Sequence, residues 1–134
     1  MSIYDTFAKY KYVQLHTFRK NGQSVGTPMW FAVEESGRIY MQTNVASGKV
    51  KRLRNRPEIE VAPSTSRGKP LGNIWRGQAT LHAPDSPVAA TSLRLLAQHY
   101  GWVFRIFNFF LNVFRRKLVY IEIELDPTSC EGPG

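Results

Sequence analysis

The sequence predicts a mainly β protein with helices, of the α+β class, in which six short strands form one antiparallel barrel. Alternation of apolar and polar residues recurs in six segments, as in strands with one buried face. Turn-forming residues separate these segments, and no βαβ unit repeats, which favours an antiparallel barrel with helices at its side. The six segments are residues 10–18, 24–34, 38–44, 58–63, 73–82 and 118–125. The 134 residues are enough for a single domain, expected over 1–134.

The alternation also predicts which strand residues face the core. In the first segment Val13, Leu15 and Thr17 share one side, and Asn21-Gly22 then favours a hairpin turn because both residues tolerate positive φ. The first three segments therefore read as a three-stranded meander. In the last segment Tyr120 is expected on the outer face; the inward residues are Ile121, Ile123 and Leu125.

A short helix interrupts the strands at residues 47–56. Alternation is absent there, Val50 and Leu53 lie three apart, and Pro57 ends the segment. Either Ser47 or Asn44 is suited to cap its N-terminus.

A longer helical insert is predicted at about 86–116. Its first helix begins at Ser86-Pro87, a favourable N-cap and first position, and ends before Gly101. The aromatic segment 102–114 is predicted to form a mostly buried helix. It has 13 residues with polar interruptions, too few to span a bilayer. The cations at 115–117 are interpreted as a helix C-terminus, with a membrane surface as the alternative, and 126–134 as a loose tail.

The net charge of +8 is compatible with an anionic partner such as nucleic acid, acidic lipid or a phosphorylated small molecule, and an ordinary solvated surface is the alternative. The single cysteine, Cys130, excludes an intrachain disulfide, and the first residues lack the apolar core of a secretion signal. A cytoplasmic protein is therefore expected. No metal site is predicted, because His16, His82 and His99 fall in different elements.

The basic helix start is the strongest candidate for a binding site. Its cations are Lys49, Lys51, Arg52, Arg54 and Arg56. A helix N-terminus offers free N–H groups and a partial positive charge, so a phosphate would satisfy both the backbone and the cations. Because Val50 and Leu53 define the buried direction, Lys49 and Arg54 flank it and can reach an anion, whereas Arg52 points outward. A solvated charged face remains the alternative.

Two further patterns allow for a planar ligand. Pro28 cannot donate to a strand ladder, so the backbone from Thr27 to Trp30 is locally unpaired. Trp75 and Gly77 share one face of the fifth strand, and a strand glycine often marks close approach of a ligand or another backbone. A plain edge proline with a core tryptophan, and a simple barrel bend, are the alternatives.

The order of these segments resembles the flavin/deazaflavin oxidoreductase superfamily, the pyridoxamine 5′-phosphate oxidase-like split barrels. The likeness is strongest to the small members that use the deazaflavin coenzyme F420. The matching pieces are KYVQLHTFRKNG, VGTPMWFAV, RIYMQT, SGKVKRLRNRPEIEVAP, WRGQATL, HYGWVFRI and LVYIEIEL.

The resemblance implies a split-barrel homodimer with two coenzyme sites, each built across the interface. It implies an oxidoreductase that transfers hydride or electrons to or from a small organic substrate. Coenzyme F420 is favoured because its polyanionic tail suits the +8 charge, and FMN is the alternative. The implied contacts are Thr27, Pro28, Met29, Trp30, Thr43 and Asn44 at the ring, Ser47, Lys49 and Arg54 at the phosphate, and Trp75 and Gly77 of the partner subunit.

Two other functions stay open. The first is a non-enzymatic barrel that binds haem or another cofactor, since fold alone does not fix function. The second is a nucleic-acid platform, because basic residues are interleaved with Trp30, Tyr40 and Trp75. The cations cluster at one helix start and do not follow a strand face, so no nucleic acid is expected.

Overall fold

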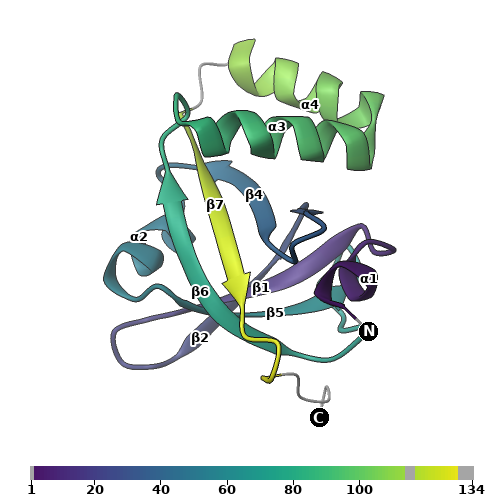
Figure 1. Cartoon of the computed structure of the whole chain (residues 1–134). Helices are drawn as coiled ribbons and strands as arrows, with labels where there is room; N and C mark the ends of the chain where they lie inside the picture. Colours follow the sequence, from purple (N-terminus) through teal and green to yellow (C-terminus); the bar gives the residue numbers. More distant parts are fainter. Residues whose placement is uncertain (1, 114–116, 130–134) are drawn as a thin grey trace.

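The computed structural model describes residues 2–113 and 117–129, which form seven strands and four helices (Figure 1). In chain order these are α1 Ile3–Phe7, β1 Tyr12–Phe18, β2 Ser24–Met29, β3 Ala32–Val33, β4 Ile39–Asn44, α2 Gly48–Asn55, β5 Glu58–Ser64, β6 Trp75–His82, α3 Pro87–Tyr100, α4 Trp102–Val113 and β7 Leu118–Leu125. The antiparallel sheet and the predicted helices confirm the α+β class.

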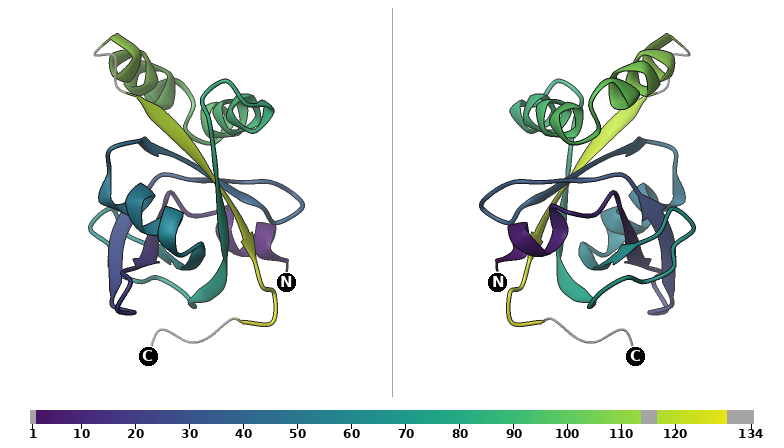
Figure 2. Two further views of the ribbon diagram at one scale, coloured as in Figure 1. Left: turned by 90° about the vertical axis from the view of Figure 1, so that its left-hand side faces the viewer. Right: turned by 90° about the vertical axis from the view of Figure 1, so that its right-hand side faces the viewer.

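The strands form one curled sheet in the order β2-β1-β5-β6-β7-β4-β3, with every neighbouring pair antiparallel (Figures 1 and 2). The edge strands β2 and β3 are separated in sequence only by Trp30 and Phe31, which we call the seam. The chain thus crosses from one edge of the sheet to the other at the seam.

The seam corrects two predictions: the described sheet has seven strands instead of six, and the first three segments do not form one meander. Segment 24–34 is broken because its halves take different partners, β2 pairing with β1 and β3 with β4. The prediction that the backbone from Thr27 to Trp30 is unpaired holds only for Trp30, because Thr27, Pro28 and Met29 all pair with β1. Beyond the break, the N–H of Phe31 donates to the hydroxyl of Tyr100, at 2.8 Å.

The barrel core follows the predicted alternation in its first strand, where Val13, Leu15 and Thr17 are buried. The helix α1 has no counterpart in the sequence prediction, yet its Phe7 is fully buried and meets Phe31 edge-on at 6.1 Å between ring centroids. The α1 segment therefore closes part of the barrel.

Tyr120 does not lie on an exposed face, as alternation predicted. It is 3% exposed, because α3 packs over that side of β7. Its hydroxyl donates to Oε1 of Gln42 at 3.0 Å. Both faces of β7 are thus covered along much of its length.

The helices α3 and α4 lie at one end of the barrel, with α4 outermost in Figures 1 and 2. The Oγ of Ser86 accepts the N–H of Ala89, and Gly101 ends α3 with φ +65°, both as predicted. The prediction of a mostly buried second helix is wrong: Trp102 is 72% exposed, and among the side chains described in α4 only Phe104 is buried.

The remaining predictions on these segments concern residues that are only partly described. The described part of the chain leaves out residues 114–116 and 130–134. These include two cations of the 115–117 run and most of the 126–134 tail. No described helix combines the length and apolarity needed to cross a membrane.

Candidate functional site

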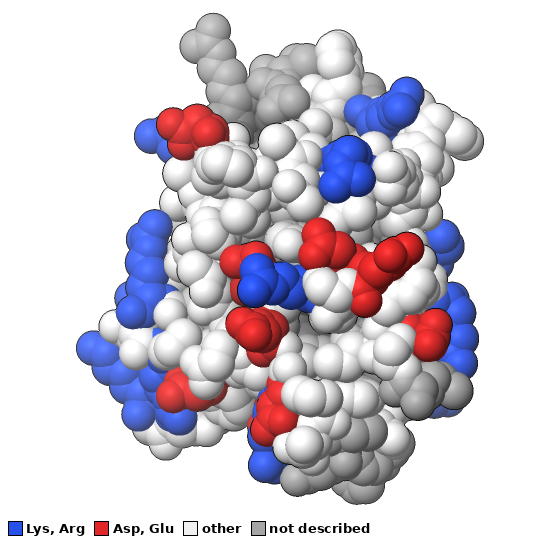
Figure 3. Space-filling view, in the orientation of Figure 1, with Lys and Arg blue, Asp and Glu red and all other residues white. Residues whose placement is uncertain are grey.

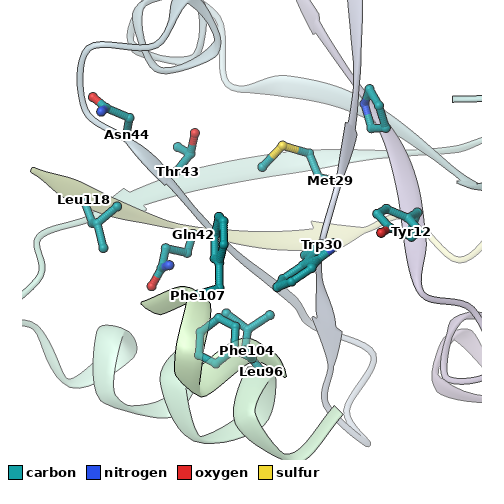
Figure 4. A pocket seen from close by; sticks show the side chains of 11 residues that line it. Tyr12, Met29, Trp30, Gln42, Thr43, Asn44, Leu96, Phe104, Phe107 and Leu118 are labelled. Carbon is teal, nitrogen blue, oxygen red and sulfur yellow. The ribbon is translucent and has the colours of Figure 1, made fainter. Parts of the chain in front are cut away.

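A cavity of about 430 Å³ lies beside the seam, between β2, β4 and the α3–α4 pair (Figure 4). Its lining is mostly apolar and aromatic, as in many small-molecule sites. The lining residues are Tyr12, Pro28, Met29, Trp30, Gln42, Thr43, Asn44, Leu96, Phe104, Phe107 and Leu118. Five of the predicted ring contacts, Pro28, Met29, Trp30, Thr43 and Asn44, therefore lie together here.

Trp30 forms one wall of the cavity and is held between aromatic rings. It stacks on Tyr100, with centroids 4.8 Å apart and planes 17° apart, and meets Phe107 at 5.1 Å. The hydroxyl of Tyr100 donates to the carbonyl of Lys11 at 2.7 Å while it accepts the N–H of Phe31. Burial raises the pKa of Tyr100 well above its ordinary value, so the hydroxyl stays protonated and keeps both hydrogen bonds at neutral pH.

The opposite wall supplies the polar groups. Gln42 is oriented by the hydroxyl of Tyr120, and Thr43 is 8% exposed at the end of β4. Asn44 accepts the N–H of Ala46 at 2.8 Å, which turns the chain from β4 toward α2. The cavity therefore combines a broad aromatic surface with a few oriented polar side chains.

The helix α2 begins just beyond this wall, with Ser47 as its N-cap. The Oγ of Ser47 makes no capping hydrogen bond and is buried without any partner in the described chain. The prediction that Ser47 or Asn44 caps the helix is thus met by Ser47 in backbone conformation alone. A buried hydroxyl without a partner is costly, so the helix start favours an additional hydrogen-bonding group.

Lys49 is half-buried at this helix start. Burial is the main cause that lowers its pKa, and the neighbouring charge of Arg52 lowers it further. No ion pair links Lys49 to a carboxylate in residues 2–113 and 117–129. An anion would relieve both effects, because it would supply the countercharge that the fold leaves out.

The other cations of α2 differ from the predicted arrangement in one respect. Arg52 does not point outward; its Nε donates to Oγ1 of Thr17 on β1 at 2.6 Å. Arg54 lines a second cavity of about 760 Å³, together with His82 and Lys117. The Lys and Arg residues along the left margin of Figure 3 extend from the level of α2 in Figure 1 down to that of the turn between β1 and β2.

The second cavity adjoins the first at Leu118, and Asn44 and Val45 line one cavity each. Of the predicted phosphate contacts, only Arg54 lines either cavity, while Ser47 and Lys49 lie at the helix start nearby. Ser47, Lys49 and Arg54 thus all lie on α2 or at its N-cap, but they do not line one common cavity.

Three predicted site residues lie away from the first cavity of their own chain. Thr27 is half-buried and pairs with Leu15 in the β1–β2 ladder. Trp75 is 8% exposed and packs in the core, and a Cβ on Gly77 would collide with the backbone oxygen of Glu124. Within this chain, the backbone that comes close to Gly77 is therefore that of the neighbouring strand β7.

Six lining residues were absent from the predicted set: Tyr12, Gln42, Leu96, Phe104, Phe107 and Leu118. Local signals exist for two of them: Tyr12 alternates with the core residues Val13 and Leu15, and Leu96 lies three residues after Leu93, on the same face of the helix. No local pattern places Phe104 and Phe107 against Trp30, since that contact depends on how α4 folds back on α3.

The comparisons with known proteins agree with this architecture. The family model described as Pyridoxamine 5′-phosphate oxidase matches residues 3–127, and no curated protein matches the sequence. Similar solved structures include a conserved hypothetical protein from Mycobacterium tuberculosis, with 22% identity over 92% of this chain and 78% of that one and a TM-score of 0.67.

Two further solved structures each cover 92% of this chain. An F420 reductase is 17% identical, is covered over 92% of its own length and has a TM-score of 0.62. HutZ, the haem storage protein from Vibrio cholerae, is 12% identical, is covered over 87% and has a TM-score of 0.68. Such likenesses show the shared fold, and with the match over residues 3–127 the chain belongs to the pyridoxamine 5′-phosphate oxidase family.

Proposed function

We propose that this chain is an oxidoreductase that binds a flavin-type coenzyme, with F420 favoured over FMN, and that it acts on a small organic substrate. The coenzyme ring occupies the cavity beside the seam, and its phosphate lies at the start of α2. The observation that carries the proposal is that the β4 wall of the cavity, residues 42–44, is followed within a few residues by the unpartnered Oγ of Ser47 and the half-buried Lys49.

The residues present fit such a coenzyme. A flat, mostly apolar ring suits the wall formed by Trp30 and the polar edge formed by Gln42 and Thr43. A phosphate suits Ser47 and Lys49, because it accepts from the hydroxyl, the free N–H groups of the helix and the ammonium at once. Arg54, in the adjoining second cavity, can contact a longer anionic tail.

The bound coenzyme would supply the hydride chemistry, and the protein's contribution is position and environment. Trp30 keeps one face of the ring site rigid, because Tyr100 and Phe107 hold it on two sides. The aromatic lining excludes water, which strengthens polar interactions inside the cavity. Tyr100 remains protonated and bound to the backbone, so it orients Trp30 and is not expected to exchange protons with the substrate.

Two copies of the chain are proposed to form the complete site. In this arrangement, Trp75 and Gly77 of the partner subunit would border the coenzyme across the interface. Sedimentation of the purified protein as a dimer would support this part of the proposal, and a monomer that binds the coenzyme with full affinity would contradict it.

The test is a side-by-side titration of the protein with F420 and with FMN. We expect tighter binding of F420, together with protection from thermal unfolding. Lys49→Ala should weaken binding by about 1–3 kcal/mol, the range for a lost charged hydrogen bond. Lys51→Ala is the matched control, since it removes the same charge from an exposed position of the same helix.

Equal affinities of the Lys49→Ala and Lys51→Ala variants would remove Lys49 from the site. Failure of the wild-type protein to bind either coenzyme would overturn the proposed function. Tight haem binding with a Soret band, or oligonucleotide binding that weakens steeply with salt, would point to the alternative functions instead.

A further inference from the structure

The helix α4 presents apolar side chains to solvent. Of the six large hydrophobic side chains that are exposed in the described chain, five lie on α4, and the sixth is Leu71. Trp102, Ile106 and Phe109 are spaced four and three residues apart, so they form one line along the helix, which we call the outer stripe. Their exposures are 72%, 48% and 63%.

The outer stripe is opposite the side of α4 that packs on the protein. Phe104 is buried among α3 residues, and the helical angle separates it by about half a turn from the outer stripe. An ordinary surface helix has polar residues in the outer position. The helix α4 is also the outermost element at its end of the molecule (Figures 1 and 2), which agrees with the exposure of these side chains.

The charge on the described part of α4 has one sign. Arg105 lies on α4 and is exposed, and the sequence contains no Asp or Glu from Ser86 to Ile121. Arg94 of α3 lines a different groove, together with Glu34 and Glu35. An apolar stripe with cations near it is typical of helices that lie in the interface of a membrane.

We propose that the outer stripe of α4 docks on a lipid surface that carries anionic headgroups. The aromatic and aliphatic side chains would enter the boundary of the acyl chains, while Arg105 contacts the headgroups. The 12 residues of α4 are too few to cross a bilayer, so the helix lies along the surface.

A second copy of the chain fits the outer stripe less well than an anionic lipid surface does. A two-fold contact through α4 would place the same patch of each copy face to face. The Arg105 side chains of both copies would then border one contact, with no carboxylate from residues 86–121 to compensate. An anionic membrane satisfies the apolar stripe and Arg105 together. The inference does not depend on the proposed coenzyme site, because neither Ser47 nor Lys49 belongs to this surface.

The test is co-sedimentation of the full chain with two kinds of vesicle, phosphatidylcholine alone and phosphatidylcholine mixed with phosphatidylglycerol. We expect binding to the mixed vesicles, weakened by salt, and little binding to the neutral ones. The double variant Trp102→Gln/Ile106→Gln should lose binding. Leu71→Gln is the matched control, since Leu71 is 48% exposed, as Ile106 is, but lies outside α4.

The charge is tested separately with Arg105→Gln, which should weaken partition to mixed vesicles roughly fivefold, against Arg67→Gln as an exposed control elsewhere. Circular dichroism of each variant checks that the fold is retained. Two outcomes would overturn the inference: wild-type protein that stays in the supernatant with mixed vesicles, or a double variant that binds them as well as the Leu71→Gln control. Dissociation of a wild-type oligomer by Trp102→Gln/Ile106→Gln would instead assign the stripe to a second copy.

Discussion

Tyr100→Phe removes a single oxygen that joins three parts of the fold. The Tyr100 hydroxyl accepts the N–H of Phe31 at the seam and donates to the carbonyl of Lys11 before β1. Phe31 is fully buried, so its N–H would be left without a partner, whereas the backbone of exposed Lys11 can turn to water. One unsatisfied buried donor and one lost hydrogen bond cost about 2 kcal/mol together.

For a chain of this length, such a loss lowers Tm by about 7 °C. Differential scanning calorimetry measures this shift, and Tyr4→Phe is the control, because the Tyr4 hydroxyl makes no hydrogen bond within the described part of the chain. The phenyl ring should still stack on Trp30, so the environment of the indole should change little. Equal Tm values for Tyr100→Phe and Tyr4→Phe would refute the reasoning and show that the seam does not depend on this hydroxyl.

Two other predictions concern stability. Gly77→Ala should destabilise the fold by about 1–3 kcal/mol in urea unfolding, because the new Cβ meets the backbone oxygen of Glu124, which cannot move cheaply. Gly48→Ala meets only a flexible arginine tip and should be close to neutral; equal losses would contradict the argument. Burial is the main cause that lowers the pKa of His99 in the folded protein. Below about pH 6.5, His99 is therefore protonated to a greater extent in the unfolded chain than in the folded one. The free energy of unfolding should therefore fall as pH decreases from 7 to 5, and His99→Gln should flatten that profile; an unchanged slope would exclude His99 as the cause.

Most strands and their core faces could be predicted from the sequence, because alternation and turn residues are local signals. The helix caps at Ser86 and Gly101 were predictable for the same reason. The break at the seam could be predicted only in part. Pro28 indicated an irregular strand, yet it pairs with Gln14, and the break follows Met29. The partner of the Phe31 N–H is a tyrosine 69 residues later. Such a contact is set by tertiary packing, which no local pattern encodes.

The candidate site divides in the same way. Pro28 was singled out by its position in a strand, whereas Thr43 and Asn44 were implied by the resemblance alone, and the structure places all three at one cavity. The aromatic residues of α4 were assigned to a buried helix, because apolar content was taken as burial. Composition cannot distinguish a helix that is buried within the fold from one whose apolar face is exposed to solvent.

The seam gives the protein a built-in reporter of local opening. Most amides of the sheet are protected by strand ladders, so their hydrogen exchange requires several bonds to break together. The Phe31 amide is held by a side chain from another element, so it can exchange whenever α3 lifts from the barrel end. A molecule that fills the neighbouring cavity and contacts both Trp30 and Leu96 would hold α3 down, and the exchange rate of that one amide would register its arrival.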